Sequence, residues 1–270
     1  MKRIKLILVC GAVLALTGLT TLLVAAGAQR DATAIVRSVF GDVTYQPAGS
    51  GTFMPLRANA ELGQKTVIKA GAGASAYLQV NGYVSMVKVT ESTTMTLKTM
   101  TTTGPGYAAD TSTDLKLDGG TIMGNVRKLS ANSDYKVTVP NGMAGIRGTD
   151  FQVTVFVQPN GAGAITVTFT SVTGLLFCQV NPPAGTTPEQ ASKMLDTGES
   201  WTVTGNMDGT TLSLGTVGLL TPIELAALRD YFRKFPPFPF PFRPLPPHLP
   251  PWIPPNPTPS DIGGGHGPHF

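Results

Sequence analysis

Histidine is scarce in this 270-residue chain, whose only copies, His248, His266 and His269, all lie near the C-terminus. The residues before them therefore lack the side chain that most often serves as a general base or zinc ligand near neutral pH. His266 and His269 stand in a glycine-rich stretch, which gives a metal site little preorganisation. The sequence also lacks a Gly-x-Ser-x-Gly elbow, a Walker phosphate loop and a glycine-rich dinucleotide motif opening a helix. These absences predict a protein that is not an enzyme and has no metal and no cofactor.

Long hydrophobic runs are missing except at the N-terminus. Three basic residues precede an uncharged apolar run over residues 6–26, and Ala26-Gly27-Ala28 offers a small-residue cleavage site. This pattern predicts a signal peptide over residues 1–28 and an exported protein. The run is also long enough to serve as an uncleaved membrane anchor, so contact with a membrane is expected only if this segment is retained.

Cysteine and charge are both sparse. Of the two cysteines, Cys10 belongs to the expected leader, and Cys178 lies in an alternating apolar run that favours burial as a small hydrophobic side chain. The mature chain therefore cannot form an intrachain disulfide. Without the three basic residues of the leader, the 20 Lys and Arg fall to 17 against 16 Asp and Glu. This balance excludes the basic surface typical of nucleic-acid binding, so no nucleic-acid partner is expected.

No helical periodicity is visible between residues 34 and 214. Short, Thr-rich alternating segments separated by Gly, Asn, Asp and Pro indicate β-strands. The expected strands cover residues 34–39, 43–46, 74–80, 83–89, 93–100, 115–117, 121–129, 135–139, 151–156, 164–170, 175–180, 201–204 and 210–214. Asn81-Gly82 predicts a type I′ hairpin turn, because both residues tolerate positive φ. The sequence thus predicts a single all-β domain over residues 29–215, built as a twisted sandwich or a solenoid-like stack.

A short amphipathic helix is expected over residues 221–235. Thr221 and Glu224 form a capping box with Pro222 at the first helical position, and apolar residues follow at helical spacing. We expect this helix to cover an open end of the β domain and its edge strand. Residues 236–270 form a Pro- and Gly-rich tail, read as a disordered or stiff spacer or, alternatively, as a docking peptide.

The most informative stretch covers residues 134–155 and reads DYKVTVPNGMAGIRGTDFQVTV. Alternating residues on both sides predict two strands that meet at a bend centred on residues 144–149. Four residues of this bend, Arg147, Gly148, Thr149 and Asp150, are the candidate site residues, although a structural role is favoured for them. Arg147 is expected to lock the bend by binding backbone carbonyls or Asp150, or else to meet an anionic ligand or a partner.

The motif and its surroundings resemble the FecR domain, an extracytoplasmic module named after the iron-dicitrate sensor. The resemblance rests on the motif itself, the opening strand at 35–43, the glycine-spaced segment at 62–76, the glycines of 117–122 and the closing turn at 195–201. The chain departs from the common Thr-Pro-small-Ala form at Val139-Pro140-Asn141-Gly142, where the bend geometry is open. The resemblance implies a bacterial protein of the periplasm, cell envelope or exterior.

Three functional hypotheses follow. The first is an exported, non-enzymatic binding or scaffolding module that engages an envelope protein or a surface glycan. The second is a sensory module of an envelope signalling pathway that acts with a separate membrane partner. The third is a cryptic carbohydrate-active enzyme, which would need two carboxylates at a defined separation. The carboxylates available in the β domain include Asp114, Asp118, Asp134, Asp150, Asp196 and Glu199, and nothing in the sequence selects a pair.

Overall fold

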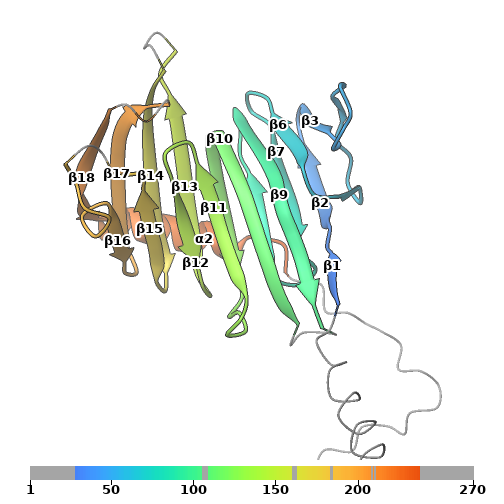
Figure 1. Cartoon of the computed structure of the whole chain (residues 1–270). Coiled ribbons are helices and arrows are strands. Elements are labelled where there is room, and N and C mark those ends of the chain that lie inside the picture. Colours follow the sequence, from blue (N-terminus) through green and yellow to red (C-terminus); the bar gives the residue numbers. More distant parts are fainter. Residues whose placement is uncertain are drawn as a thin grey trace, which may run out of the picture. The chain divides into compact units, whose positions relative to one another are not determined.

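The computed structural model of the chain describes residues 28–104, 109–159, 163–182, 185–207, 209 and 211–237 (Figure 1). Strands make up 58% of the described residues and one short C-terminal helix makes up 6% of them, so the predicted all-β class is confirmed. The predicted signal peptide, apart from Ala28, lies outside the described residues. The same is true of the three histidines and of the tail beyond Pro237.

The strands form two sheets that share one long strand, β10 (Asp110–Val126). In the first sheet the order is β4–β3–β6–β9–β10–β11–β12–β15–β16, and β1 pairs with the second half of β9. Its strands are β1 (Gln29–Asp31), β3 (Val43–Gln46), β4 (Met54–Pro55), β6 (Thr66–Ala70), β9 (Thr93–Thr103), β11 (Asp134–Val139), β12 (Gly142–Ile146), β15 (Leu176–Val180) and β16 (Ser192–Leu195).

In the second sheet the order is β5–β2–β7–β8–β10–β13–β14–β17–β18. Its strands are β2 (Ala34–Phe40), β5 (Glu61–Leu62), β7 (Ser75–Val80), β8 (Ser85–Val89), β13 (Asp150–Val157), β14 (Ala164–Thr173), β17 (Glu199–Asn206) and β18 (Leu212–Leu219). Within the described residues neither sheet is closed, so each ends in two edge strands.

The chain advances steadily along the molecule while it alternates between the two sheets. In each sheet the strand order largely follows the sequence, from β2 and β3 at one end to β16 and β18 at the other (Figure 1). Almost all pairs are antiparallel, and β10–β11 is the parallel exception. The architecture therefore combines the two expected forms: the sheets face each other as in a sandwich, and successive strands step forward as in a solenoid.

The core fills the space between the sheets. Side chains point alternately to the two faces of a strand, so every second residue of most strands is buried. The buried apolar residues form one continuous cluster from Ala34 to Val203. Across the interface Tyr135 and Phe151 meet edge to face at 6.4 Å, and Phe169 stacks on Trp201 at 6.0 Å within the second sheet. Burial of this apolar surface is the main source of stability for a chain without disulfides. Cys178 is buried in this core, as predicted.

The motif stretch differs from the prediction in one respect. An additional strand, β12, occupies Gly142–Ile146, so the bend contains only Arg147–Thr149. The expected strand before the bend, β11, therefore pairs with β12 in the first sheet, whereas β13 after the bend lies in the second. The strand β12 was not predicted because glycine and alanine, which make up three of its five residues, have low β-propensity and are common in loops. The bend therefore carries the chain from one sheet to the other.

Two further strand predictions need correction. The segments expected at 115–117 and 121–129 are parts of a single strand, β10, which continues through Gly119-Gly120. Besides β12, five strands were not predicted: β1, β4, β5, β6 and β16. Four of these have only two to four residues, which is too short to show an alternating pattern. A hairpin does turn at Asn81-Gly82, where φ is 52° and 67°. The predicted two-residue type I′ turn is wrong, however, because Val80 pairs with Ser85 and the loop therefore has four residues.

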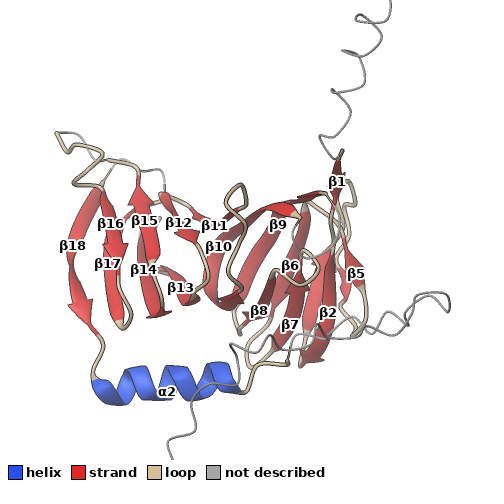
Figure 2. Ribbon diagram, turned by 90° about the horizontal axis from the view of Figure 1, so that it is seen from below, coloured by secondary structure: helices blue, strands red, loops and turns tan. Residues whose placement is uncertain are grey.

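The helix α2 (Pro222–Arg233) begins at the predicted capping box, where Thr221 and Glu224 bind each other's backbone N–H groups. We expected this helix to cover an edge strand, and that prediction is wrong. Figure 2 shows α2 lying along one side of the strands, where Phe232 and Phe235 pack with three residues from the outer face of the second sheet. Those residues are Met86 on β8, Met123 on β10 and Val172 on β14. The apolar residues on this outer face explain the position of the helix, because they would otherwise remain in contact with water.

Among the described residues, no helix combines the length and apolar character needed to cross a membrane.

Candidate functional site

The motif bend is fixed by glycine geometry. Gly148 has φ of +72°, and a Cβ atom there would lie 3.4 Å from the Cα of Lys128. Gly174 faces it with φ of +75°, and a Cβ atom there would lie 3.1 Å from the carbonyl oxygen of Gly148. Glycine adopts such backbone angles with the least strain, so a side chain is disfavoured at both Gly148 and Gly174.

Arg147 binds the loop between β10 and β11. Its Nη2 donates to the carbonyl oxygens of Ser130 at 3.0 Å and of Ala131 at 3.3 Å. Of the two partners predicted for this side chain, the structure thus shows backbone carbonyls. The identity of the loop was not predictable, because 16 and 17 residues separate the partners in sequence.

Thr149 and Asp150 bind neighbouring strands instead of an open surface. Thr149 is buried and its Oγ1 donates to the carbonyl oxygen of Leu175 at 2.9 Å. The Asp150 carboxylate accepts from Thr173 Oγ1 at 3.0 Å and from Asn125 Nδ2. The backbone N–H of Asp150 also donates to Thr173 Oγ1 at 3.0 Å. These bonds join β13 to β10 and β14, which supports a structural role for the motif.

A hollow of about 480 Å³ with a mixed polar and apolar lining borders the loop that Arg147 binds. It is lined by Ala32, Thr33, Asn81, Gly82, Tyr83, Val84, Thr102, Ala109, Thr111, Arg127, Lys128, Leu129, Ser130 and Ser133. Asn81 is buried at its edge, where its Nδ2 donates to the carbonyl oxygen of Thr101 and to Thr113 Oγ1, both at 3.1 Å. Hydroxyl groups and two cations make this hollow suitable for polar groups of a partner.

A second hollow of about 360 Å³ borders the same loop and is more apolar. It is lined by Ser133, Asp134, Tyr135, Gly145, Ile146, Arg147, Leu175, Phe177 and Met194. Leu175 is 52% exposed and Met194 is 57% exposed. Exposed Met, Leu and Phe side chains beside an arginine match the composition of protein-binding surfaces. The two hollows and the motif bend between them form the candidate site.

Two buried titratable side chains of the core, Tyr135 and Cys178, have raised pKa values. Burial raises the pKa of Tyr135, despite the hydrogen bond of 2.9 Å between its hydroxyl and that of Ser85. Burial also raises the pKa of the Cys178 thiol. Both side chains therefore stay protonated at neutral pH and are poor bases or nucleophiles.

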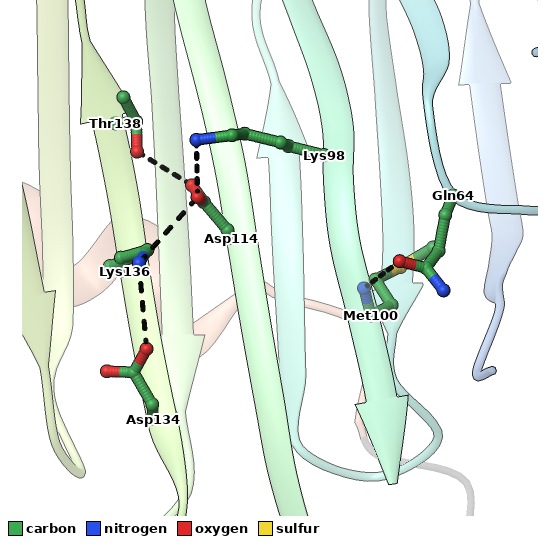
Figure 3. A network of polar contacts seen from close by, with 7 residues as sticks. All are labelled: Gln64, Lys98, Met100, Asp114, Asp134, Lys136 and Thr138. Atoms are coloured by element: carbon green, nitrogen blue, oxygen red, sulfur yellow. Dashed lines mark hydrogen bonds and ion pairs between the residues drawn. The ribbon is translucent and has the colours of Figure 1, made fainter. Parts of the chain in front are cut away.

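The carboxylates considered for glycoside hydrolysis bind other groups. Asp114 lies buried between β9 and β11, where it accepts from Thr138 Oγ1 at 2.7 Å and pairs with Lys98 Nζ at 2.9 Å and Lys136 Nζ at 3.9 Å (Figure 3). Asp134 shares Lys136 at 3.9 Å.

The carboxylates of Asp118 and Glu199 also bind other groups of the chain. Asp118 pairs with Lys116 at 2.7 Å, and Glu199 accepts the backbone N–H of Asp196 at 2.7 Å. In the part of the chain that the structure describes, no group of three or more metal-ligating residues occurs. These contacts support a structural use of the acids. Lys98 and Lys136 were not predicted as partners of Asp114, because their approach depends on the register of β9, β10 and β11.

Comparison with known proteins identifies a family for part of the chain. Residues 60–172 match the family described as FecR protein. No curated protein matches the chain. Two crystal structures of a "putative anti-sigma factor" from Parabacteroides distasonis ATCC 8503, at 2.50 Å and 1.65 Å resolution, are similar with a TM-score of 0.41 and 13% identity. The similarity covers 60% of this chain and 62% or 63% of those chains, which is less than two thirds of their length.

The matched residues begin just before β5, end within β14 and include the whole motif bend. The all-β fold and the glycine-dependent bend agree with the resemblance found in the sequence. Residues 60–172 are therefore the part of this chain that is similar to the FecR family.

Proposed function

We propose that this chain is the sensory module of a bacterial envelope signalling pathway and acts by binding a separate membrane-associated protein. The family match over residues 60–172 carries this proposal, because the family is named after a sensor. The proposal includes export through the predicted leader. It favours the second of the three sequence-based hypotheses over a scaffolding or glycan-binding module.

The geometry of the candidate site supports a binding role. The motif bend is held by hydrogen bonds on both sides, and the flanking hollows offer one surface of mixed polarity and one that is more apolar. Rigid scaffolds that present such mixed surfaces are suited to protein recognition. No nucleophile paired with a base lines either hollow within the described residues, which supports a non-enzymatic function.

The test is made in the bacterium from which the chain comes. Deletion of the gene should change the transcript levels of a limited set of other genes, and wild-type protein should restore them. A Met194→Asp variant should fail to restore them, because a charge in the apolar hollow opposes partner binding. The matched control is Phe40→Asp on β2, which alters a side chain that is 71% exposed at the other end of the molecule. Both variants must be exported in equal amounts and melt like wild type.

A deletion that leaves all other transcripts unchanged would contradict a sensory function. Turnover of a polysaccharide by the purified chain would contradict the non-enzymatic part of the proposal.

A further inference from the structure

Besides β1, a three-residue edge strand that contains Arg30 and Asp31, the two sheets have four edges, and three of them carry features that prevent pairing with another chain. The first sheet ends at β4, which has two residues including Pro55, and at β16, which has four residues including Lys193. The second sheet begins at β5, a two-residue strand that contains Glu61. Short length, proline and charge are the usual means by which proteins protect an edge strand.

The fourth edge, β18, has none of these three features, and along its described residues one register shift against β17 is its only irregularity. It extends over eight residues with the sequence LSLGTVGL and contains no charged residue and no proline. Within the described residues it pairs with β17 alone. In such an edge strand every second residue directs its N–H and C=O groups away from the sheet. β18 therefore presents unpaired backbone groups along an uncharged strand.

The side chains of β18 also leave the core incompletely covered. Leu212, Leu214 and Val217 pack against the main core, but each remains partly exposed. Figures 1 and 2 both show β18 at the outermost end of its sheet. An additional strand beside β18 would remove more of these three side chains from water, which is favourable by about 25 cal/mol per Å² of apolar surface.

We propose that β18 is a docking edge for a second copy of this chain, whose own β18 pairs with it in an antiparallel manner. The second sheet of one protomer would then continue into that of its partner across a two-fold axis. Such an interface is isologous, so one strand must be complementary to itself.

The sequence of β18 meets this requirement. Because it has no charge, two copies meet without like-charge repulsion. A register shift opposite Thr202 divides the strand into two regular segments, Leu212–Leu214 and Val217–Leu219. A partner related by two-fold symmetry presents the same two segments in reverse order. Leu219 is 80% exposed in one protomer and would gain apolar neighbours from the other.

Sedimentation velocity and light scattering on the purified full chain, over about 1 to 200 μM, test the proposal by mass action. We expect the average mass to rise from one toward two protomers. The double variant Ser213→Lys/Thr216→Lys changes two exposed side chains on β18 and should remain a monomer, because lysine on an edge opposes pairing. The control Thr202→Lys/Thr204→Lys adds the same charge to exposed positions on the adjacent strand β17 and should dimerise like wild type.

Hydrogen exchange locates the contact. The outward backbone amides of β18 should exchange more slowly as the concentration rises, whereas those of β16 should not change. If the double variant melts earlier than wild type, the single variant Thr216→Lys replaces it, because Thr216 is exposed and lies at the register shift.

Three results would overturn the proposal. The first is a monomer at every concentration, and the second is a dimer that persists in the β18 variants. The third is protection of the β18 amides that does not depend on concentration, because another part of the same chain would then cover the edge.

Discussion

At the scale of single residues, Arg147 connects the motif bend to the loop between β10 and β11. Its guanidinium reaches two successive carbonyl oxygens, those of Ser130 and Ala131. The planar fork of arginine suits two acceptors at once, whereas the ammonium group of lysine is a single point charge. The same loop borders both hollows of the candidate site, so Arg147 also positions their common wall.

We predict that Arg147→Lys lowers the free energy of unfolding by about 1 kcal/mol, because one hydrogen bond to a charged group is lost near the surface. Urea unfolding followed by circular dichroism measures the change. The control is Arg30→Lys on the exposed strand β1, which should leave stability within about 0.5 kcal/mol of wild type. An Arg147→Lys variant with wild-type stability but without the transcriptional response would instead assign Arg147 to partner binding.

The residue scale also shows what the sequence could and could not predict. The motif indicated that Arg147 would bind backbone carbonyls or Asp150, because the neighbouring glycines permit the backbone to turn toward either. It could not identify Ser130 and Ala131, since their position depends on how two strands from different parts of the chain align. Burial of Asp114 between two lysines was equally invisible, because it depends on the register of β9, β10 and β11.

At the scale of elements, α2 is held by its apolar side and by one cation. Phe232 and Phe235 lie in a small cluster with Met86, and their rings are 4.7 Å apart. Lys88 lies 4.7 Å from the ring centroid of Tyr231 and donates a hydrogen bond to its hydroxyl. Cation–π contacts of this kind add modestly to apolar packing.

We predict that Phe232→Ala destabilises the protein by about 3 kcal/mol, because a large buried side chain is removed from this cluster. Hydrogen exchange should quicken first in α2 and β8. The control on the same helix is Ile223→Ala, which changes a side chain that is 83% exposed and should cost less than about 0.5 kcal/mol. Equal effects of the two substitutions would contradict the observed orientation of the helix.

The capping box predicts a dependence on pH. The hydrogen bonds from Thr221 hold the pKa of Glu224 below its ordinary value of 4.5. A carboxyl with a lowered folded-state pKa stabilises the protein above its unfolded pKa, and that contribution is lost as pH falls through the folded value. Wild type should therefore lose more melting temperature than Glu224→Gln when pH is lowered from about 6 to 3. Parallel losses in the two proteins would show that the box contributes nothing to the acid response.

The boundaries of α2 were predictable because capping residues and prolines act locally. Its docking position was not, since it depends on Met86, Met123 and Val172, which the sheet brings together from three strands. The same contrast separates strands that were predicted from those that were missed. β13 and β14 were predictable because apolar and polar residues alternate along them. β12 was not, because its sequence, rich in glycine and alanine, shows no such alternation.

At the scale of the whole molecule, β10 joins the two sheets. Its first half pairs with β9 and β11, and its second half pairs with β8 and β13. The change of sheet occurs around Gly119-Gly120, where a register shift also appears. Gly120 has φ of +91°, and a Cβ atom there would lie 2.5 Å from the Cα of Thr93. The sequence marked these glycines as part of the family resemblance but assigned two strands to a segment that the structure shows as one.

We predict that Gly120→Ala destabilises the protein by about 2 to 5 kcal/mol, because the left-handed backbone and the contact with Thr93 both oppose a side chain. The adjacent control is Gly119→Ala, whose Cβ would meet only Val157 Cγ2 at 3.8 Å and which should stay within about 1 kcal/mol of wild type. Since one strand belongs to both sheets, both should unfold in a single transition, even in the weakened variant. Fluorescence of Trp201, with Trp252→Phe in every protein, reports on the second sheet, and hydrogen exchange of β11 reports on the first. Separate unfolding midpoints for the two probes would mean that β10 does not couple the two sheets.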